Sequence, residues 1–416
     1  MRTWVLASTM LATGLLLLPD VLRAQQAPSP NVTVQERPRP RYDPLGIRAG
    51  SYLIFPSVRV EGTYDSNVFA TPNDEDDDFG VIISPRINAR SQFARHRLDL
   101  SAFAEIGRYK EFSRNNYEDF GVAATGVLDI TRRQNLRLRL SAARQHETRA
   151  EPDAVGRGDD VTKYWNLLAD LAYRVNFNRV FVQPQAGVRR LDYEDTGNIN
   201  QDDRDRNVYQ VGLRAGYAVS PRFNVFGQGM YNIRRYDETP DDAGDDRDSD
   251  GYTLSLGTEI DITGIIFGEI QLGYSKQNYD DNDLDDVQGF GGSGRLTWNV
   301  TPLTTIIGEI VGEVRETTVV YQGDEASAAK HTEIGVDVTH ELRRNVLLNG
   351  NARYLRDDFE GTDRVDDIFR VGAGVTYLLN RNLSIDARYR FDTRKSDDND
   401  AEFDRHQVFV GIVAKL

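Results

Sequence analysis

From Tyr52 to the end of the chain, apolar and polar residues alternate with a period of two. The segment 97–106 shows the pattern on its apolar side, with Leu98, Leu100, Ala102, Ala104 and Ile106. A period of two places alternate side chains on opposite faces of a β-strand. The same alternation returns in segments 252–262 and 383–392. The chain is therefore predicted to consist of strands that are each apolar on one face and polar on the other.

The connections between these strands alternate between short and long. Eight short turns lie near 94–96, 132–135, 176–179, 220–222, 264, 301–302, 343–344 and 380–382. Nine longer loops lie near 71–78, 113–117, 149–161, 195–205, 238–251, 280–286, 319–328, 360–366 and 396–402. Seventeen connections join 18 strands, and the even number places both ends of the strand array on the short-turn side. Regular alternation of this kind is typical of a barrel in an outer membrane.

The composition agrees with strands that are half in lipid. Only 39% of residues are hydrophobic, and mean hydropathy is −0.53, whereas aromatic residues reach 10%. In hydrocarbon every backbone polar group needs a partner, so a spanning sheet must close on itself and show lipid only one face. We predict an all-β fold, a transmembrane antiparallel up-and-down barrel of about 18 strands. Its turns would be short and periplasmic, and its long, acidic loops would be extracellular.

Aromatic residues mark both ends of the predicted strands. At the periplasmic end, the lipid-facing positions are Tyr173, Tyr217, Trp298 and Tyr377. At the outer end they are Tyr64, Trp165, Tyr231, Tyr274, Tyr354 and Tyr389. Aromatic girdles at the two membrane interfaces are expected of an outer-membrane barrel.

The amino-terminal region divides into two parts ahead of the barrel at 50–416. Residues 1–24 combine a basic start with an apolar run of about 14 residues, which is short of the roughly 20 that a spanning helix needs. We predict a cleaved signal peptide and an outer-membrane location. Residues 25–49 are rich in proline and predict an extended periplasmic tether without a core. The alternation ending at Leu416 resembles the signature recognised by the barrel assembly machinery, although the usual last residue is phenylalanine.

Several classes of function are disfavoured by the residues themselves. The formal charge of −15 argues against nucleic acid as a partner, and the absence of cysteine excludes thiolate chemistry. The histidines are dispersed and lack metal-pair spacing; they are His96, His146, His331, His340 and His406. No Ser-His pair suggests catalysis, so we expect neither an enzyme nor a bound cofactor.

The acidic residues concentrate in the long loops, and one loop partly resembles a calcium site. Residues 246–251 copy the first six positions of a calcium-binding loop, but Gly257 occupies the position that needs a bidentate carboxylate. We therefore predict no metal site and prefer solvated, mutually repelling loops. Weak calcium bridging between loops, or to lipopolysaccharide, stays open as an alternative.

Charged residues on the polar face predict a hydrated lumen. The lumen-lining candidates are Arg59, Glu61, Arg86, Arg90, Arg137, Arg139, Glu259, Glu309, Glu313, Arg353, Arg370, Asp386, Arg388 and Arg390. Opposite charges on neighbouring strands could simply pair and hold the wall. They could equally form a conduit that contacts a polar solute. At about 18 strands the barrel is wide enough for an aqueous channel unless a loop or the tether closes it.

Residues 64–69 (YDSNVF) stand at the end of the first predicted strand. Together with Pro56 in that strand and Pro85 in the next, they resemble the putative beta-barrel porin 2 family of Gram-negative bacteria. The resemblance covers about residues 50–416. It implies an outer-membrane barrel in a family often linked to exopolysaccharide or capsule export, acting beside periplasmic export proteins.

Three hypotheses about function follow from the sequence. The first is a conduit or accessory protein for polysaccharide export, as the resemblance implies. The second is a general diffusion porin for small solutes, which usually folds one long loop inward to narrow the pore. The third is a structural or surface-interaction barrel. The longest loops, 149–161 and 238–251, are highly charged, and either could stay outside.

Overall fold

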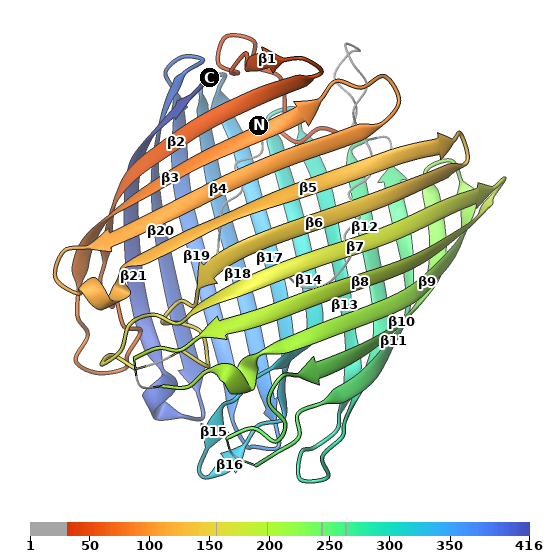
Figure 1. The fold of residues 1–416 in the computed structure, drawn as a ribbon. Helices are drawn as coiled ribbons and strands as arrows, with labels where there is room; N and C mark the ends of the chain where they lie inside the picture. Colours follow the sequence, from red (N-terminus) through yellow and green to blue (C-terminus); the bar gives the residue numbers. More distant parts are fainter. Residues whose placement is uncertain (1–30, 155, 198, 243, 263) are drawn as a thin grey trace.

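The chain forms one closed barrel of antiparallel strands (Figure 1). The computed structural model describes residues 31–154, 156–197, 199–242, 244–262 and 264–416. The wall is closed by pairing of the first barrel strand, β2, with the last, β21, from Ser57 opposite Lys415 to Asp65 opposite Gln407. Within these residues the wall contains 18 strands, which confirms the predicted fold and strand number.

Each barrel strand pairs with its two neighbours around the wall. The barrel strands are β2 (Tyr52–Asp65), β3 (Asp78–Ser91), β4 (Arg97–Tyr109), β5 (Tyr117–Thr131), β6 (Gln134–His146), β7 (Lys163–Phe177), β8 (Val180–Glu194), β9 (Arg206–Ser220), β10 (Phe223–Tyr236), β11 (Ser249–Ile262), β12 (Ile266–Tyr279), β13 (Val287–Thr301), β14 (Thr304–Glu316), β17 (Ala328–Arg343), β18 (Val346–Glu360), β19 (Val365–Leu378), β20 (Leu383–Ser396) and β21 (Phe403–Lys415). The short turns all lie at one end of the barrel and the long loops at the other, as the sequence predicted.

The remaining elements are short and lie outside the wall. A three-residue strand, β1 (Ile47–Ala49), pairs with the start of β2 through a turn at Gly50, whose φ of 59° suits glycine. Two two-residue strands, β15 (Val320–Tyr321) and β16 (Asp324–Glu325), form a hairpin in the loop between β14 and β17. Single 3₁₀ turns are η1 (Ser113–Asn115), η2 (Asp202–Arg204) and η3 (Asn399–Ala401). Across the described ranges no helix has the length and apolar character that crossing a membrane requires.

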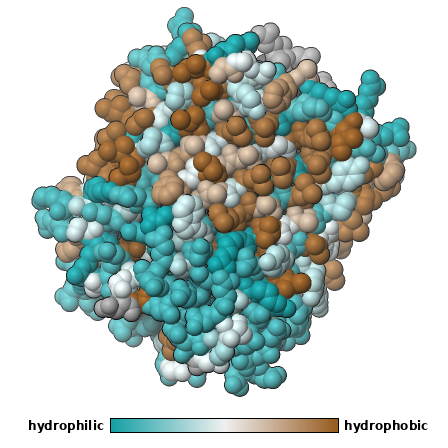
Figure 2. Space-filling model, in the orientation of Figure 1, coloured by the Kyte–Doolittle hydropathy of each residue, from teal (hydrophilic) through white to brown (hydrophobic). Residues whose placement is uncertain are grey.

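The outer surface of the wall carries the apolar residues that the alternation predicted. Figure 2 shows hydrophobic residues gathered over the strands and hydrophilic ones over the loop end. Large side chains such as Leu256 (75% exposed) and Phe290 (91% exposed) face outward, which a water-soluble protein would avoid. The predicted lipid-facing aromatics include exposed Trp298 and Tyr377 at the turn end. At the outer end Tyr354 packs on exposed Phe369 of the neighbouring strand, with ring centroids 4.9 Å apart.

The YDSNVF segment ties the first strand to the last at the outer end of the barrel. Asp65 is fully buried and accepts hydrogen bonds from Arg405 Nε (2.9 Å) and Gln407 Nε2 (2.6 Å), both in β21. The Asn67 side chain donates to the carbonyls of Thr71 (2.7 Å) and Asp404 (3.1 Å). The segment that carried the family resemblance therefore holds the seam at which the barrel closes.

Residues 31–46 differ from the predicted tether, because they form turns packed in the turn-side mouth of the barrel. Val34 is fully buried, and its N–H donates to Thr305 Oγ1 at 2.8 Å. Arg39 and Glu341 form a buried ion pair of 2.7 Å, and Asn31 donates to Asp261 at 3.1 Å. These partners project from lumen-facing positions of the strands. Proline-rich composition alone could not show that a few side chains would find partners there. The predicted signal peptide at 1–24 lies outside the described residues.

Candidate functional site

The loop between β6 and β7, residues 147–162, runs across the lumen instead of staying outside. We name it the inner loop. Its Asp153 accepts hydrogen bonds from Thr317 Oγ1 (2.7 Å) and from the Thr318 N–H (2.8 Å), in the connection between β14 and β17. Six strands of wall separate β7 from β14. On another side of the barrel, Arg394 of β20 donates to the carbonyl of Ala150 in the same loop. The inner loop therefore narrows the barrel.

Charged groups anchor the inner loop where it leaves the wall. Glu147 and Arg204 form a buried ion pair, with Nη1 to Oε2 at 3.1 Å, and the Arg204 guanidinium lies 4.0 Å from the centre of the Tyr193 ring. Arg149 donates to Asn115 Oδ1 at 2.9 Å and to the loop's own carbonyls at Gly156 (2.9 Å) and Asp159 (2.6 Å). Each of these bonds fixes the path of the loop.

The YDSNVF segment also supports the inner loop. The guanidinium groups of Arg149 and Arg157 lie 5.5 Å and 5.1 Å from the centre of the Phe69 ring, in cation–π geometry. Phe69 is buried, and Arg157 also pairs with Asp76 in the loop after β2. The closing seam of the barrel and the constriction are thus connected through one aromatic side chain.

Burial changes the acidity of the groups in and beside the inner loop. It raises the pKa of Glu151, a rise opposed by nearby Arg315, Arg370 and Arg394. Burial also raises the pKa of Glu147, although Arg204 acts against the rise. At Arg204 burial would lower the pKa, but Glu147 outweighs it and the pKa is raised. In the adjoining loop burial raises the pKa of Asp205 to about 7. The carboxyls in and beside the inner loop therefore bind protons at higher pH than exposed carboxyls do.

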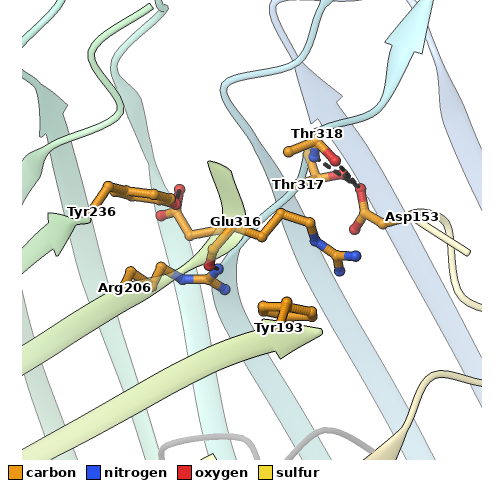
Figure 3. Close-up of a pocket in the computed structure, with 8 residues that line it drawn as sticks. Asp153, Tyr193, Arg206, Tyr236, Glu316, Thr317 and Thr318 are labelled. Atoms are coloured by element: carbon orange, nitrogen blue, oxygen red, sulfur yellow. Dashed lines mark hydrogen bonds between the residues drawn. The ribbon is translucent and has the colours of Figure 1, made fainter. Parts of the chain in front are cut away.

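A small pocket lies between the inner loop and the wall (Figure 3). Its lining residues are Asp153, Tyr193, Arg204, Arg206, Tyr236, Glu316, Thr317 and Thr318. Glu316 accepts from Tyr236 Oη at 2.9 Å and pairs with Arg234, while Arg206 Nη1 donates to the carbonyl of Arg204 at 2.6 Å. Guanidinium groups, carboxylates and aromatic rings therefore meet where the lumen is narrowed. Such a site can select passing solutes by charge and by size.

Most of the predicted lumen residues pair with charges nearby, as the wall-holding interpretation expected. The pairs and their shortest distances are Arg59–Asp386 (3.1 Å), Arg388–Glu61 (2.7 Å), Arg174–Glu259 (3.2 Å), Arg353–Glu309 (3.3 Å), Arg315–Glu313 (2.8 Å), Arg370–Asp392 (2.9 Å) and Arg390–Asp392 (3.0 Å). Most of these ion pairs link strands of the barrel wall. That the same residues contact a solute stays a hypothesis.

The other predicted lumen residues have different surroundings. Arg90 lies 5.2 Å from the centre of the Phe55 ring, and Arg137 stands opposite Ala172 of β7. Among the described residues, Arg86 and Arg139 lie in no ion pair; Arg139 stands opposite Asp170 in the sheet register. The sequence alone did not single out Arg206, Tyr236 or Glu316. Extending the alternation to the strand ends would have placed them inward.

Three carboxylates of the acidic loops lie close together beside an arginine side chain. Ligand oxygens of Asp241, Asp245 and Glu325 lie within 4.8 Å of one another. Arg247 donates to Asp241 at 2.8 Å and also pairs with Glu325, so its guanidinium already supplies positive charge to the cluster. The geometry therefore adds no support for the calcium alternative.

The comparisons with known proteins agree with this architecture. The model of the putative beta-barrel porin 2 family matches residues 39–416. The chain belongs to this family. It is thus an outer-membrane β-barrel porin, and the family consists of channels rather than enzymes. A comparison with curated proteins finds no significant match.

Solved porins align with this chain at low similarity. OpdK of Pseudomonas aeruginosa, solved with vanillate, is 11% identical, covers 87% of this chain and 99% of its own, and gives a TM-score of 0.45. A BenF-like porin from Pseudomonas fluorescens Pf-5 is also 11% identical over 87% of this chain and 99% of its own, with a TM-score of 0.46. Similarity this low says nothing about the solutes of this porin.

Proposed function

We propose that this porin is a diffusion channel for small hydrophilic solutes, with the inner loop as its size-limiting element. The observation that carries the proposal is the loop's path across the lumen, from β6 to the contact of Asp153 with Thr318. An inward loop was the feature that the sequence could not decide and that a diffusion porin usually has. The charged pocket beside it supplies polar contacts for solutes without a closed binding site.

Export of a polymer is the weaker hypothesis for this geometry. A polysaccharide chain needs a continuous passage with many weak contacts, because a tight obstruction stops translocation. Here the inner loop narrows the outer half, and residues 31–46 pack in the turn-side mouth through Val34 and the Arg39–Glu341 pair. Passage of a polymer would require both obstructions to move. The export hypothesis rests on the family resemblance alone.

The proposal includes the predicted surroundings of the barrel. Residues 1–24 would direct export to the periplasm, and the alternating last strand would be recognised by the assembly machinery. The lipid-facing band would contact outer-membrane lipid, and the acidic loops would stay solvated beside lipopolysaccharide. These partners are inferred from residue patterns and from the exposed apolar wall.

Two measurements separate the hypotheses. Liposomes that contain the purified barrel should swell with monosaccharides and disaccharides but not with longer oligosaccharides. Replacing residues 150–158 by a short Gly-Ser linker should admit the longer ones and raise single-channel conductance severalfold, while the heat-dependent gel mobility of the barrel stays unchanged. A chain without conductance, whose deletion abolishes a surface polysaccharide, would instead support export.

A further inference from the structure

Two arginines beside the constriction lack the carboxylate partner that their neighbours have. Arg189 in β8 donates from Nε to Asn166 Oδ1 at 3.1 Å, and Arg206 donates to a backbone carbonyl. Neither forms an ion pair with any residue that the structure describes. The adjacent arginines are compensated, since Arg204 pairs with Glu147 and Arg234 pairs with Glu316. The group of four therefore carries two guanidinium charges without a direct carboxylate partner.

The two arginines lie close together on the lumen face. In the pairing of β8 with β9, Arg189 stands opposite Val208 and Leu191 stands opposite Arg206. The two arginines are therefore diagonal neighbours on the same face of the sheet. Arg206 is only 9% exposed. Two like charges in a partly dry place are costly without an anion. A solute anion that enters the lumen would relieve this cost.

The position of the pair suits a solute on its way through the pore. Arg206 lines the pocket under the inner loop, with Tyr193 and Tyr236 on either side of it (Figure 3). Arg189 lies four residues before Tyr193 in β8, and therefore further from the loop end. A solute that passes the inner loop meets Arg206 first and Arg189 next.

We propose that Arg189 and Arg206 form a subsite for the carboxylate of a small, singly charged solute. The planar guanidinium fork matches the two oxygens of a carboxylate. The charge of the ligand is limited because Asp153 lies within electrostatic reach of Arg206, and Glu313 within reach of Arg189. These carboxylates repel a second negative charge. The inference rests on the proposed channel function and names its preferred solute class.

Reversal potentials across planar bilayers test the subsite, with acetate as the probe. In gradients of potassium acetate the wild-type barrel should favour acetate over potassium more strongly than the double variant Arg189→Gln with Arg206→Gln. The expected loss in the permeability ratio is on the order of tenfold, which corresponds to about 1.4 kcal/mol. Arg222→Gln removes the same charge from an exposed turn at the far end and serves as the matched control.

A second variant separates charge from geometry. Arg206→Lys keeps the positive charge but loses the planar guanidinium fork. In gradients of potassium chloride its preference for chloride over potassium should therefore equal that of the wild type, whereas in potassium acetate its preference for acetate over potassium should fall. Unchanged heat-dependent gel mobility would show that each variant still forms a barrel. If the double variant has the same conductance and the same ion selectivity as Arg222→Gln, the proposed subsite is wrong, but the proposed channel function is not contradicted. If the wild-type barrel does not conduct at all, the proposed channel function fails instead.

Discussion

The two mouths of the barrel are narrowed by different means. At the loop end, the inner loop continues into the wall at both ends, through β6 and β7, and is held midway by Thr317, Thr318 and Arg394. At the turn end, the described part of the amino-terminal segment, residues 31–46, continues into the wall through β1. They are also held by contacts with the barrel that include the Arg39–Glu341 pair and the Val34–Thr305 hydrogen bond.

The two obstructions differ in how freely they can move. A loop fixed at both ends and bonded across the lumen has few alternative paths, so it acts as a permanent part of the pore. Residues 31–46 are held in the mouth by side-chain contacts such as the Arg39–Glu341 pair, and regions held in this way open before the strands of a wall do. We expect the loop to set the size limit, and the segment to open and close independently of it.

Both mouths depend on the same wall. The largest expected effect, a loss of barrel assembly, comes from a charge placed on the lipid-facing side of this wall. Leu100→Arg places a charge on the outer face of β4, where Leu100 is 41% exposed; near the bilayer midplane the cost is about 2–4 kcal/mol. Ser101→Arg places the same side chain toward the lumen and should assemble far better. Amounts of heat-modifiable barrel in outer-membrane fractions measure the difference. Equal assembly of the two variants would contradict the assignment of the faces.

Weakening the loop's anchor should have the next largest effect. Arg149→Ala removes bonds to Asn115, Gly156 and Asp159, and the loss should loosen the inner loop by about 1–3 kcal/mol. Single-channel records should then show noisy openings to a larger conductance. Arg179→Ala, in an exposed turn at the other end, is the control. A variant with wild-type conductance and noise would mean that Arg149 does not hold the constriction.

The chain lacks cysteine, so single cysteines can compare the two mouths directly. Val34→Cys and Val161→Cys each place a thiol at a buried position, one in the amino-terminal segment and one in the inner loop. We expect Val34→Cys to react severalfold faster with a maleimide. Adding Arg39→Ala should accelerate Val34→Cys and leave Val161→Cys unchanged. Faster labelling of Val161→Cys would reverse the proposed roles of the two obstructions.

The smallest expected effect is a pH dependence at the inner loop. Because burial raises the pKa of Glu151, this carboxyl binds a proton more readily in the folded loop than when exposed. As pH falls, its negative charge should disappear at a higher pH than the charges of exposed carboxylates. The docked loop is then stabilised and anion preference rises. Glu151→Gln should show the higher preference already at neutral pH, with a flatter profile. Parallel profiles for variant and wild type would exclude Glu151 as the source.

The wall of this porin could be predicted from the amino-acid sequence. Strand number, strand faces, aromatic girdles and the alternation of turns with loops could all be predicted, because lipid and water impose a period of two on every strand separately. Each of these features is local, so a short segment such as 97–106 is enough to predict which face of a strand contacts lipid.

The contacts inside the wall could not be predicted in this way, because they join residues far apart in the chain. The inner loop contacts Thr318 from Asp153, the amino-terminal segment contacts Glu341 from Arg39, and the seam joins Asp65 to Arg405. The two residues of each pair are separated by more than 150 residues, and many other polar or charged groups were available to each partner. Which charges meet depends on barrel closure and on the registers of intervening strands. A local period carries no information about either.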